Sequence, residues 1–187
     1  ISRELLSPGH PLDIYLFPAN SARPFETLVT LGCSDKQLKA PKGLEQYRYV
    51  ELVLCLPQGW PMPTAEPLAA ELRWPFEALK SMVQVPRKSN SFLGHGHTIP
   101  NSEMAQLFAG TSFNCVLLDQ ALIGEIVLPD IHYPNGQILT FLGAFPITEK
   151  ETQFKIENGH EALVTLMQSR NFFSSLVNIN RPCLIET

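Results

Sequence analysis

The sequence contains few of the features that would assign it to nucleic acid or to a membrane. Lysine and arginine number 14 against 18 acidic residues, so a net charge of −4 leaves no concentrated basic surface for phosphate. The longest apolar runs, Val50–Leu56 and Ala121–Leu128, are each interrupted by glutamate. Both are far shorter than the roughly 20 residues of a membrane-spanning helix. We therefore expect neither nucleic acid nor a membrane as a partner.

Cysteine is scarce and is not spaced for metal binding. The four cysteines, Cys33, Cys55, Cys115 and Cys183, lie far apart and form no CxxC motif. Three of them sit within or beside apolar runs, so we expect free thiols that pack as small hydrophobic side chains. No segment resembling a secretory leader is recognisable at the start of the sequence. These features favour a cytoplasmic protein.

The sequence also lacks the short motifs that organise catalysis and phosphate binding. It contains no GxSxG, no GxxxxGKS and no GxGxxG. Cys33 follows Gly32 at the end of an expected strand, where a small residue after a tight turn is equally expected. Glu51 fits a salt bridge with Arg48 within a sheet better than it fits an acid catalyst. We expect a non-enzymatic protein without a cofactor.

One motif is compatible with an enzyme, which we retain as the alternative. In Gly-His-Gly-His, an extended chain would place the imidazoles of His95 and His97 on one side, as a zinc or iron site requires. A metal centre needs further ligands, and the candidates His132, Asp130 and Glu103 have no recognisable spacing. We favour a structural or ligand-orienting loop without a metal. The alternative is a metal-dependent hydrolase that uses His95 and His97.

Short strands separated by prolines are expected along most of the chain. Sixteen prolines punctuate the sequence, and proline ends strands or begins helices. Tyr47–Leu56 alternates between an aliphatic and a mixed face, which predicts a strand with one face on the core. The other expected strands are Leu12–Phe17, Phe25–Leu31, Phe113–Leu118, Gly124–Leu128 and Gln137–Leu142. We expect the last two to pair as a hairpin, because they flank a Pro-Asn-Gly turn signal.

Helical spacing appears in the middle of the chain. Between residues 66 and 84, apolar side chains recur every three or four positions. Pro75 falls inside this pattern and predicts two helical segments, the second beginning at Pro75 with Trp74 packed beneath it. Ser91–Thr111 has no regular period and predicts a long surface loop.

Two further helices are expected near the end of the chain. Thr148 and Glu151 have the spacing of a capping box, in which each side chain satisfies a backbone N–H of the other residue. Asn158 and Glu161 repeat this spacing and predict a second helix through about Gln168. Strands followed by helices indicate an α+β architecture.

The order of these motifs resembles the suppressor-of-fused domain family. The matching segments are Thr-Leu-Val-Thr-Leu-Gly-Cys-Ser (27–34), Tyr-Val-Glu-Leu-Val-Leu (49–54), Leu-Pro-x-x-Trp (56–60), Trp-Pro (74–75), Gly-His-Gly-His-Thr (94–98), Phe-Asn-Cys-Val-Leu-Leu (113–118), Phe-Leu (141–142) and Pro-Ile-Thr-Glu-Lys-Glu-x-x-Phe (146–154). The resemblance covers about residues 10–170. It implies one α+β domain over residues 1–187, with a mixed or antiparallel sheet flanked by helices.

The resemblance also implies a protein that acts by binding another protein. Animal members inhibit Hedgehog signalling by sequestering a zinc-finger transcription factor and have an additional C-terminal domain. This chain is similar only to the N-terminal domain, so the Hedgehog role is not transferred. Stand-alone members of this size look bacterial, and some resemble immunity proteins that neutralise secreted toxins. We expect such an immunity protein or a regulatory adaptor; a small-molecule sensor or a homodimeric scaffold is a third alternative.

The partner is expected to bind at the irregular loop and its surroundings. Loops and sheet edges offer variable side chains and unpaired backbone groups. The candidate partner-binding residues are Trp60, His95, His97, Asn101 and His132. Alanine at His95 and His97 is expected to weaken partner capture with little change in melting temperature.

Overall fold

The computed structural model describes residues 2–7, 10–63 and 68–185. In these ranges the strands are β1 (Ser2–Ser7), β2 (His10–Phe17), β3 (Phe25–Leu31), β4 (Val50–Pro57), β5 (Thr98–Pro100), β6 (Cys115–Gln120), β7 (Leu122–Ile123), β8 (Ile126–Val127), β9 (Ile131–His132) and β10 (Ile138–Ile147). The helices are η1 (Glu45–Arg48, a 3₁₀ turn), α1 (Ala70–Ser89), α2 (Glu149–Asn158) and α3 (His160–Ser169). None of these helices combines the length and hydropathy needed to cross a bilayer.

A mixed sheet forms the centre of the fold. Its strand order is β1-β2-β3-β4-β10-β6-β5, with β9 paired to β10 off this path. Strand β10 runs parallel to β4, with Thr140–Gly143 beside Val50–Val53, whereas the other strand pairs in the described ranges are antiparallel. The expected α+β architecture with a mixed sheet is therefore confirmed.

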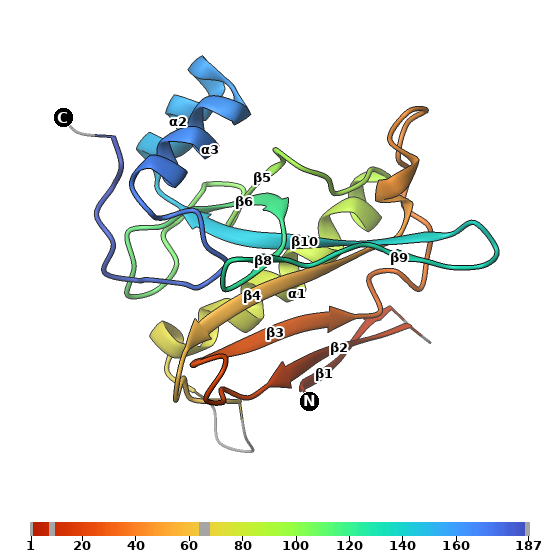
Figure 1. The fold of residues 1–187 in the computed structure, drawn as a ribbon, viewed down its shortest axis with the longest axis horizontal. Coiled ribbons are helices and arrows are strands. Elements are labelled where there is room, and N and C mark those ends of the chain that lie inside the picture. The colour runs from red at the N-terminus through yellow and green to blue at the C-terminus, as the bar shows by residue number, and fades with distance from the viewer. Residues whose placement is uncertain (1, 8–9, 64–67, 186–187) are drawn as a thin grey trace.

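Helix α1 covers one face of this sheet and lies behind it in Figure 1. Side chains alternate between the two faces of a strand, so the even-numbered residues of β4 all point toward this helix. Trp74, Leu79 and Val83 of α1 are buried in the same hydrophobic cluster as the aliphatic side chains Val50, Leu52, Leu54 and Leu56.

The expected break of this helix at Pro75 is wrong. Helix α1 runs without interruption from Ala70 to Ser89 and contains both Pro75 and Pro86. Proline removes one backbone hydrogen bond within a helix, which is unfavourable. Trp74 and Phe76, on either side of Pro75, are buried against the sheet. Tertiary packing therefore outweighs the local preference of proline, and Trp74 lies in the helix rather than before it.

The opposite face of the sheet is covered by the last part of the chain. Leu163 and Met167 of α3 pack with Leu117, Phe145 and Ile147 in a second hydrophobic cluster. These odd-numbered residues of β6 and β10 point away from α1. The sheet therefore has a hydrophobic core on each side, and β4 is buried on both faces rather than on one.

The expected C-terminal helices are present. Thr148 caps α2 and forms the complete capping box with Glu151. Helix α3 also forms, but its expected cap is wrong: Gly159 occupies the N-cap position. The side-chain amide of Asn158 instead donates to the carbonyl of Phe154 and so belongs to the end of α2.

The expected pairing of Gly124–Leu128 with Gln137–Leu142 is wrong. Strand β8 pairs with β7, and β10 pairs with β9. Gly124, at φ +65°, lies in the two-residue connection between β7 and β8. This short connection favours a local hairpin over pairing of β8 with the more distant β10. The Pro-Asn-Gly turn does connect two paired strands, β9 and β10. The irregular segment 91–111 is a loop except for β5, which pairs with β6.

Candidate functional site

The Gly-His-Gly-His segment is a tight turn packed against aromatic rings. The imidazole of His95 meets the ring of Tyr47 edge-on at 5.4 Å, and that of His97 meets Phe92 at 4.7 Å. Tyr47 and Phe92 stack on each other at 6.1 Å. Because each histidine contacts a different ring, the two imidazoles do not converge on one point. The expectation that they share one side of an extended chain is wrong, because Gly96, at φ +78°, turns the backbone between them.

Both glycines of this segment lie in close contact with rings. A Cβ at Gly94 would stand 3.1 Å from atoms of Tyr47 and Phe92. A Cβ at Gly96 would stand 3.1 Å from the imidazole of His160, whose Nε2 lies 2.9 Å from Oδ2 of Asp119. The glycines thus allow the loop to approach η1, through Tyr47, and α3, through His160, closely.

His95 and His132 are brought together. They line one pocket of about 610 Å³ between η1, the Gly-His-Gly-His turn and the segment that precedes β10. His132 lies on β9 and is exposed. Asp130 lines the same pocket, and Gln46, Gln120 and Thr140 add two carboxamides and a hydroxyl to its polar groups. Such groups can donate and accept hydrogen bonds at a binding surface.

An exposed apolar segment borders this pocket. We name residues 122–133, which contain β7, β8 and β9, the arm; in Figure 1 it crosses in front of the central strands. Ile126 is 74% exposed and Ile131 is 44% exposed, and Val127 and Tyr133 are exposed as well. Apolar side chains that gather on a surface commonly mark a site of interaction. The arm and the pocket beside it are therefore the candidate functional site.

The other three predicted residues lie elsewhere. The indole N–H of Trp60 donates to the carbonyl of Leu72 at 2.9 Å, and Trp60 lines a different pocket. The amide of Asn101 donates to the carbonyls of Gln106 and Leu107, which fixes the shape of its own loop. His97 borders a third pocket. The predicted set is thus divided among several places, and two of its five members, His95 and His132, line the same pocket.

The setting of His97 shifts its protonation. Burial lowers the pKa of the His97 imidazole, and the positive charge of Lys155 lowers it further. The same lysine donates to the hydroxyl of Thr98 at 3.5 Å, which holds its ammonium group beside the turn. A neutral imidazole packed on Phe92 is consistent with a structural role for this residue.

Neither a metal centre nor a reactive thiol is supported by the geometry. Across residues 12–63 and 68–185, no group of three or more His, Cys, Asp or Glu side chains is arranged to hold a metal ion. Burial, together with the negative charge of Glu51, raises the pKa of the Cys33 thiol far above its ordinary value. Cys33 therefore stays protonated and unreactive. Cys33, Cys55 and Cys115 are buried free thiols, and Cys183 is half-buried.

The expected salt bridge between Glu51 and Arg48 is wrong. Glu51 accepts hydrogen bonds from the hydroxyls of Thr30 and Ser34, at 2.6 and 2.7 Å, and from two backbone N–H groups. Arg48 lies in η1, before the strand begins, and pairs with Glu45 at 3.8 Å. Burial raises the pKa of Glu51 although these hydrogen bonds oppose the shift. This carboxylate fixes the end of β3 against β4.

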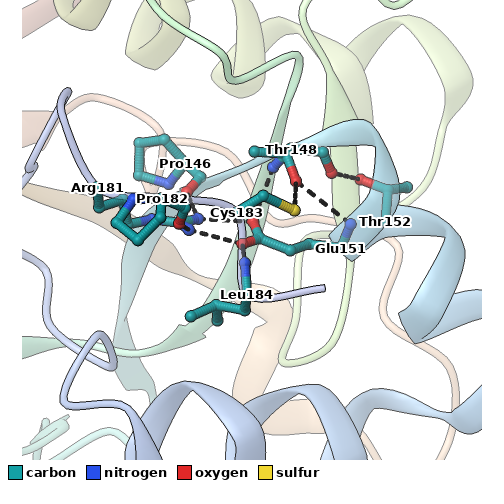
Figure 2. A network of polar contacts seen from close by, with 8 residues as sticks. All are labelled: Pro146, Thr148, Glu151, Thr152, Arg181, Pro182, Cys183 and Leu184. Carbon is teal, nitrogen blue, oxygen red and sulfur yellow. Dashed lines mark hydrogen bonds and ion pairs between the residues drawn. The ribbon is translucent and has the colours of Figure 1, made fainter. Parts of the chain in front are cut away.

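Sequence reasoning missed the most deeply buried ion pair of the described residues. Both terminal nitrogens of Arg181, Nη1 and Nη2, donate to the carboxylate of Glu151, which also accepts the N–H groups of Thr148 and Leu184 (Figure 2). The guanidinium lies 4.8 Å from the centre of the Phe113 ring. This network anchors the segment after α3, and its role is structural. The capping box was its only sequence signal.

The protein is an α+β domain whose mixed sheet lies between two hydrophobic clusters. Aromatic rings pack around its Gly-His-Gly-His turn. The sequence matches the family described as suppressor of fused protein (SUFU) over residues 8–182, and the chain belongs to that family. The expected family is thereby confirmed. No curated protein matches the sequence.

Solved structures of the same family share this fold. The chain is similar to one in the Sufu–Fu complex, with a TM-score of 0.60, 14% identity and coverage of 93% of this chain and 77% of that one. Drosophila Suppressor of Fused gives a TM-score of 0.61 at 15% identity, covering 93% of this chain and 42% of that one. A SUFU homolog from Neisseria gonorrhoeae FA 1090 gives a TM-score of 0.56 at 18% identity, covering 94% of this chain and 79% of that one. At these identities the likeness concerns the fold.

Proposed function

We propose that this chain is a non-enzymatic protein-binding domain that binds its partner through the arm and the adjoining pocket. The observation that carries the proposal is the exposure of Ile126, Val127, Ile131 and Tyr133 beside a pocket lined by His95 and His132. One relative was solved as the Sufu–Fu complex, so that protein binds another protein. Protein binding by this chain is consistent with membership of the same family.

The chemistry of the arm suits a protein interface. Interfaces combine a buried apolar centre with a polar rim. Here the apolar side chains of the arm would form the centre, and His95, Asp130 and His132 would form the rim. Pro129 and Pro134 fix φ on either side of β9, so less conformational entropy is lost when a partner binds.

We further propose that the partner is a toxin that this chain neutralises, or a regulator that it holds as an adaptor. This chain covers 79% of the N. gonorrhoeae homolog, which is consistent with a single domain over residues 1–187. The free thiols suit a reducing cytoplasm, which is the compartment we propose.

Capture from the native cell tests this proposal. The wild-type chain and the variant Ile126→Asp/Ile131→Asp serve as baits, and retained proteins are identified by mass spectrometry. A charged residue at two exposed apolar positions should abolish capture of the specific partner, because a buried unpaired carboxylate opposes binding. The control is Ile156→Asp on α2, where Ile156 is 67% exposed outside the arm.

The result depends on both variants remaining folded. Each replaced side chain is exposed, so melting temperatures should stay within about 3 °C of wild type. Equal capture by wild type and the arm variant would reject the arm as the binding surface. Loss of capture in the control alone would move the surface to α2. The variant His95→Ala/His132→Ala should weaken capture less than the arm variant, because both residues lie at the rim.

A further inference from the structure

The two central strands continue to helices on opposite faces of the sheet. After β4 the chain leads to α1, which packs on one side, and after β10 it leads to α2 and α3, which close the other. These strands are parallel neighbours, so both exits lie at the same end of the sheet, on the left in Figure 1. Where parallel strands send their connections to opposite faces, a crevice opens beyond their carboxyl ends, and open sheets bind ligands there.

The strands separate before either one ends. Pairing of β4 with β10 stops at Val53 and Gly143, although β10 continues beside β6 to Ile147. Beyond that point Cys55 bonds to the C-terminal segment: its N–H donates to Ser175 at 2.8 Å, and its carbonyl accepts from Val177 at 2.9 Å. The segment after α3 thus lies in the gap between the diverging strands.

This gap is not completely filled. A pocket of about 670 Å³ remains between the turn at 57–61 and the C-terminal segment at 171–181. Its volume lies within the range of about 300 to 1,000 Å³ that is usual for small-molecule sites. The pocket is separate from the arm and from the pocket that holds His95 and His132. Trp60, a candidate partner-binding residue from the sequence, lines it.

The lining is aromatic and carries no free charge. Trp60, Phe113, Phe145 and Phe172 contribute rings. Arg181 is the only charged residue among the described lining residues, and its guanidinium is bonded to Glu151 and to the carbonyl of Pro146. A charged ligand would therefore lose its hydration without gaining a counter-ion.

Carboxamides provide the polar part of the pocket. Gln58, Asn171, Asn178 and Asn180 lie around its mouth and are all exposed. Their side chains can donate to and accept from an uncharged amide or hydroxyl. We propose that this pocket binds an uncharged aromatic small molecule that carries an amide or hydroxyl group, with its ring among the aromatic side chains and its polar group at the carboxamides.

Three probes that share one indole ring test the class of ligand. N-acetyltryptophanamide is neutral, N-acetyltryptophan is an anion and tryptamine is a cation. Each is titrated into the full ¹⁵N-labelled chain, and backbone amide shifts are followed by NMR. We expect the neutral probe to bind with a Kd below about 1 mM, as its size allows. Its shift changes should be confined to the residues that line the pocket, in segments 57–61 and 171–181 and at Phe113, Phe145 and Met167. Both charged probes should bind at least about tenfold more weakly.

A pair of variants tests the location. Leu176 is 38% exposed and lines the pocket, so Leu176→Arg places an unpaired charge there while the backbone bonds of the segment remain. This change should weaken the neutral probe about tenfold or more. Ile156→Arg on α2 should leave its affinity unchanged. Absence of saturable binding, equal binding of the anion, shifts outside the pocket or unchanged affinity in Leu176→Arg would each overturn the proposal.

Discussion

Arg181 and Glu151 lie 30 residues apart and form a two-pronged ion pair in which both nitrogen–oxygen distances are 2.6 Å. The Glu151 side chain is 0% exposed and that of Arg181 is 5% exposed. The same carboxylate completes the N-terminal cap of α2 and accepts the N–H of Leu184. One buried acid therefore joins the start of a helix to the C-terminal segment that borders the proposed ligand pocket.

Removing the arginine should strongly destabilise the fold. In Arg181→Met the buried carboxylate of Glu151 loses its counter-ion, and we expect a loss of about 3 to 5 kcal/mol in the free energy of unfolding. Urea denaturation measures this loss. The control is Arg48→Met, which breaks an exposed ion pair with Glu45 and should cost at most about 1 kcal/mol. The double variant Glu151→Leu/Arg181→Met should recover part of the loss, because no charge then remains buried. Equal losses in the two arginine variants would contradict this account.

Low pH should destabilise the fold through Glu151 as well. Burial raises the pKa of Glu151, but the hydrogen bonds and charge of Arg181 outweigh burial and hold it below the ordinary value of 4.5. The unfolded chain then binds this proton more readily than the folded chain does. The stabilisation from Glu151 is therefore present above pH 4.5 and is lost as the pH falls through the folded pKa.

Denaturation at a series of pH values checks this sign. Glu151→Gln should remove part of the decline in stability below pH 4.5. Glu51 provides the opposite case, because burial raises its pKa above 4.5. The contribution of Glu51 to stability is fully present below pH 4.5 and is lost as the pH rises through the folded pKa. Glu51→Gln should therefore remove part of a decline in stability that occurs with rising pH. Identical pH profiles for the two variants would refute the assignment.

The glycine between the two histidines should be intolerant of a side chain. Gly96→Ala places a Cβ at φ +78° and 3.1 Å from the His160 ring. Gly43→Ala is the matched control, since Gly43 has φ +90° and nothing within 4 Å. Backbone strain alone should cost about 1 to 2 kcal/mol in the control, and Gly96→Ala should cost more. Thermal and urea denaturation give both values. In a His160→Ala background the excess should disappear, and its persistence would show that the contact is not the cause.

The imidazole of His97 should titrate below its ordinary value of 6.5 because burial and the charge of Lys155 oppose its protonation. NMR titration of the His97 ring measures this pKa directly. Lys155→Met should raise it, whereas Lys150→Met, on the exposed side of the same helix, should leave it unchanged. Its contribution to stability is present above pH 6.5 and is lost as the pH falls through the folded pKa. An unchanged His97 pKa in Lys155→Met would contradict the packing of Lys155 beside this ring.

Local signals predicted those parts of the fold that depend on neighbouring residues. Phe25–Leu31 is a strand with the bounds that its composition indicates, and the capping box at Thr148 is complete. Predictions failed where distant packing decides the structure. Helix α1 passes through Pro75 because Trp74 and Phe76 are buried against strands remote in sequence.

The candidate site could likewise be predicted only in part, because its arrangement depends on residues distant in the sequence. The alternation of His95 and His97 assumed an extended chain, but the positive φ of Gly96 turns it. That His95 and His132 line one pocket depends on how β9 pairs with β10, which no short motif encodes. Arg181 carries no signal of its own, because its partner Glu151 lies 30 residues earlier, in α2.

The parallel pairing of β4 with β10 has a consequence for the order of folding. Strands β2, β3 and β4 form antiparallel neighbours in chain order, so their contacts close short loops. Strand β4 acquires its second neighbour only when the distant β10 arrives, which requires closure of a long loop and is intrinsically slow. A chain truncated before Ile138 would present the apolar edge of β4 to other copies, and self-association through that edge is the expected result.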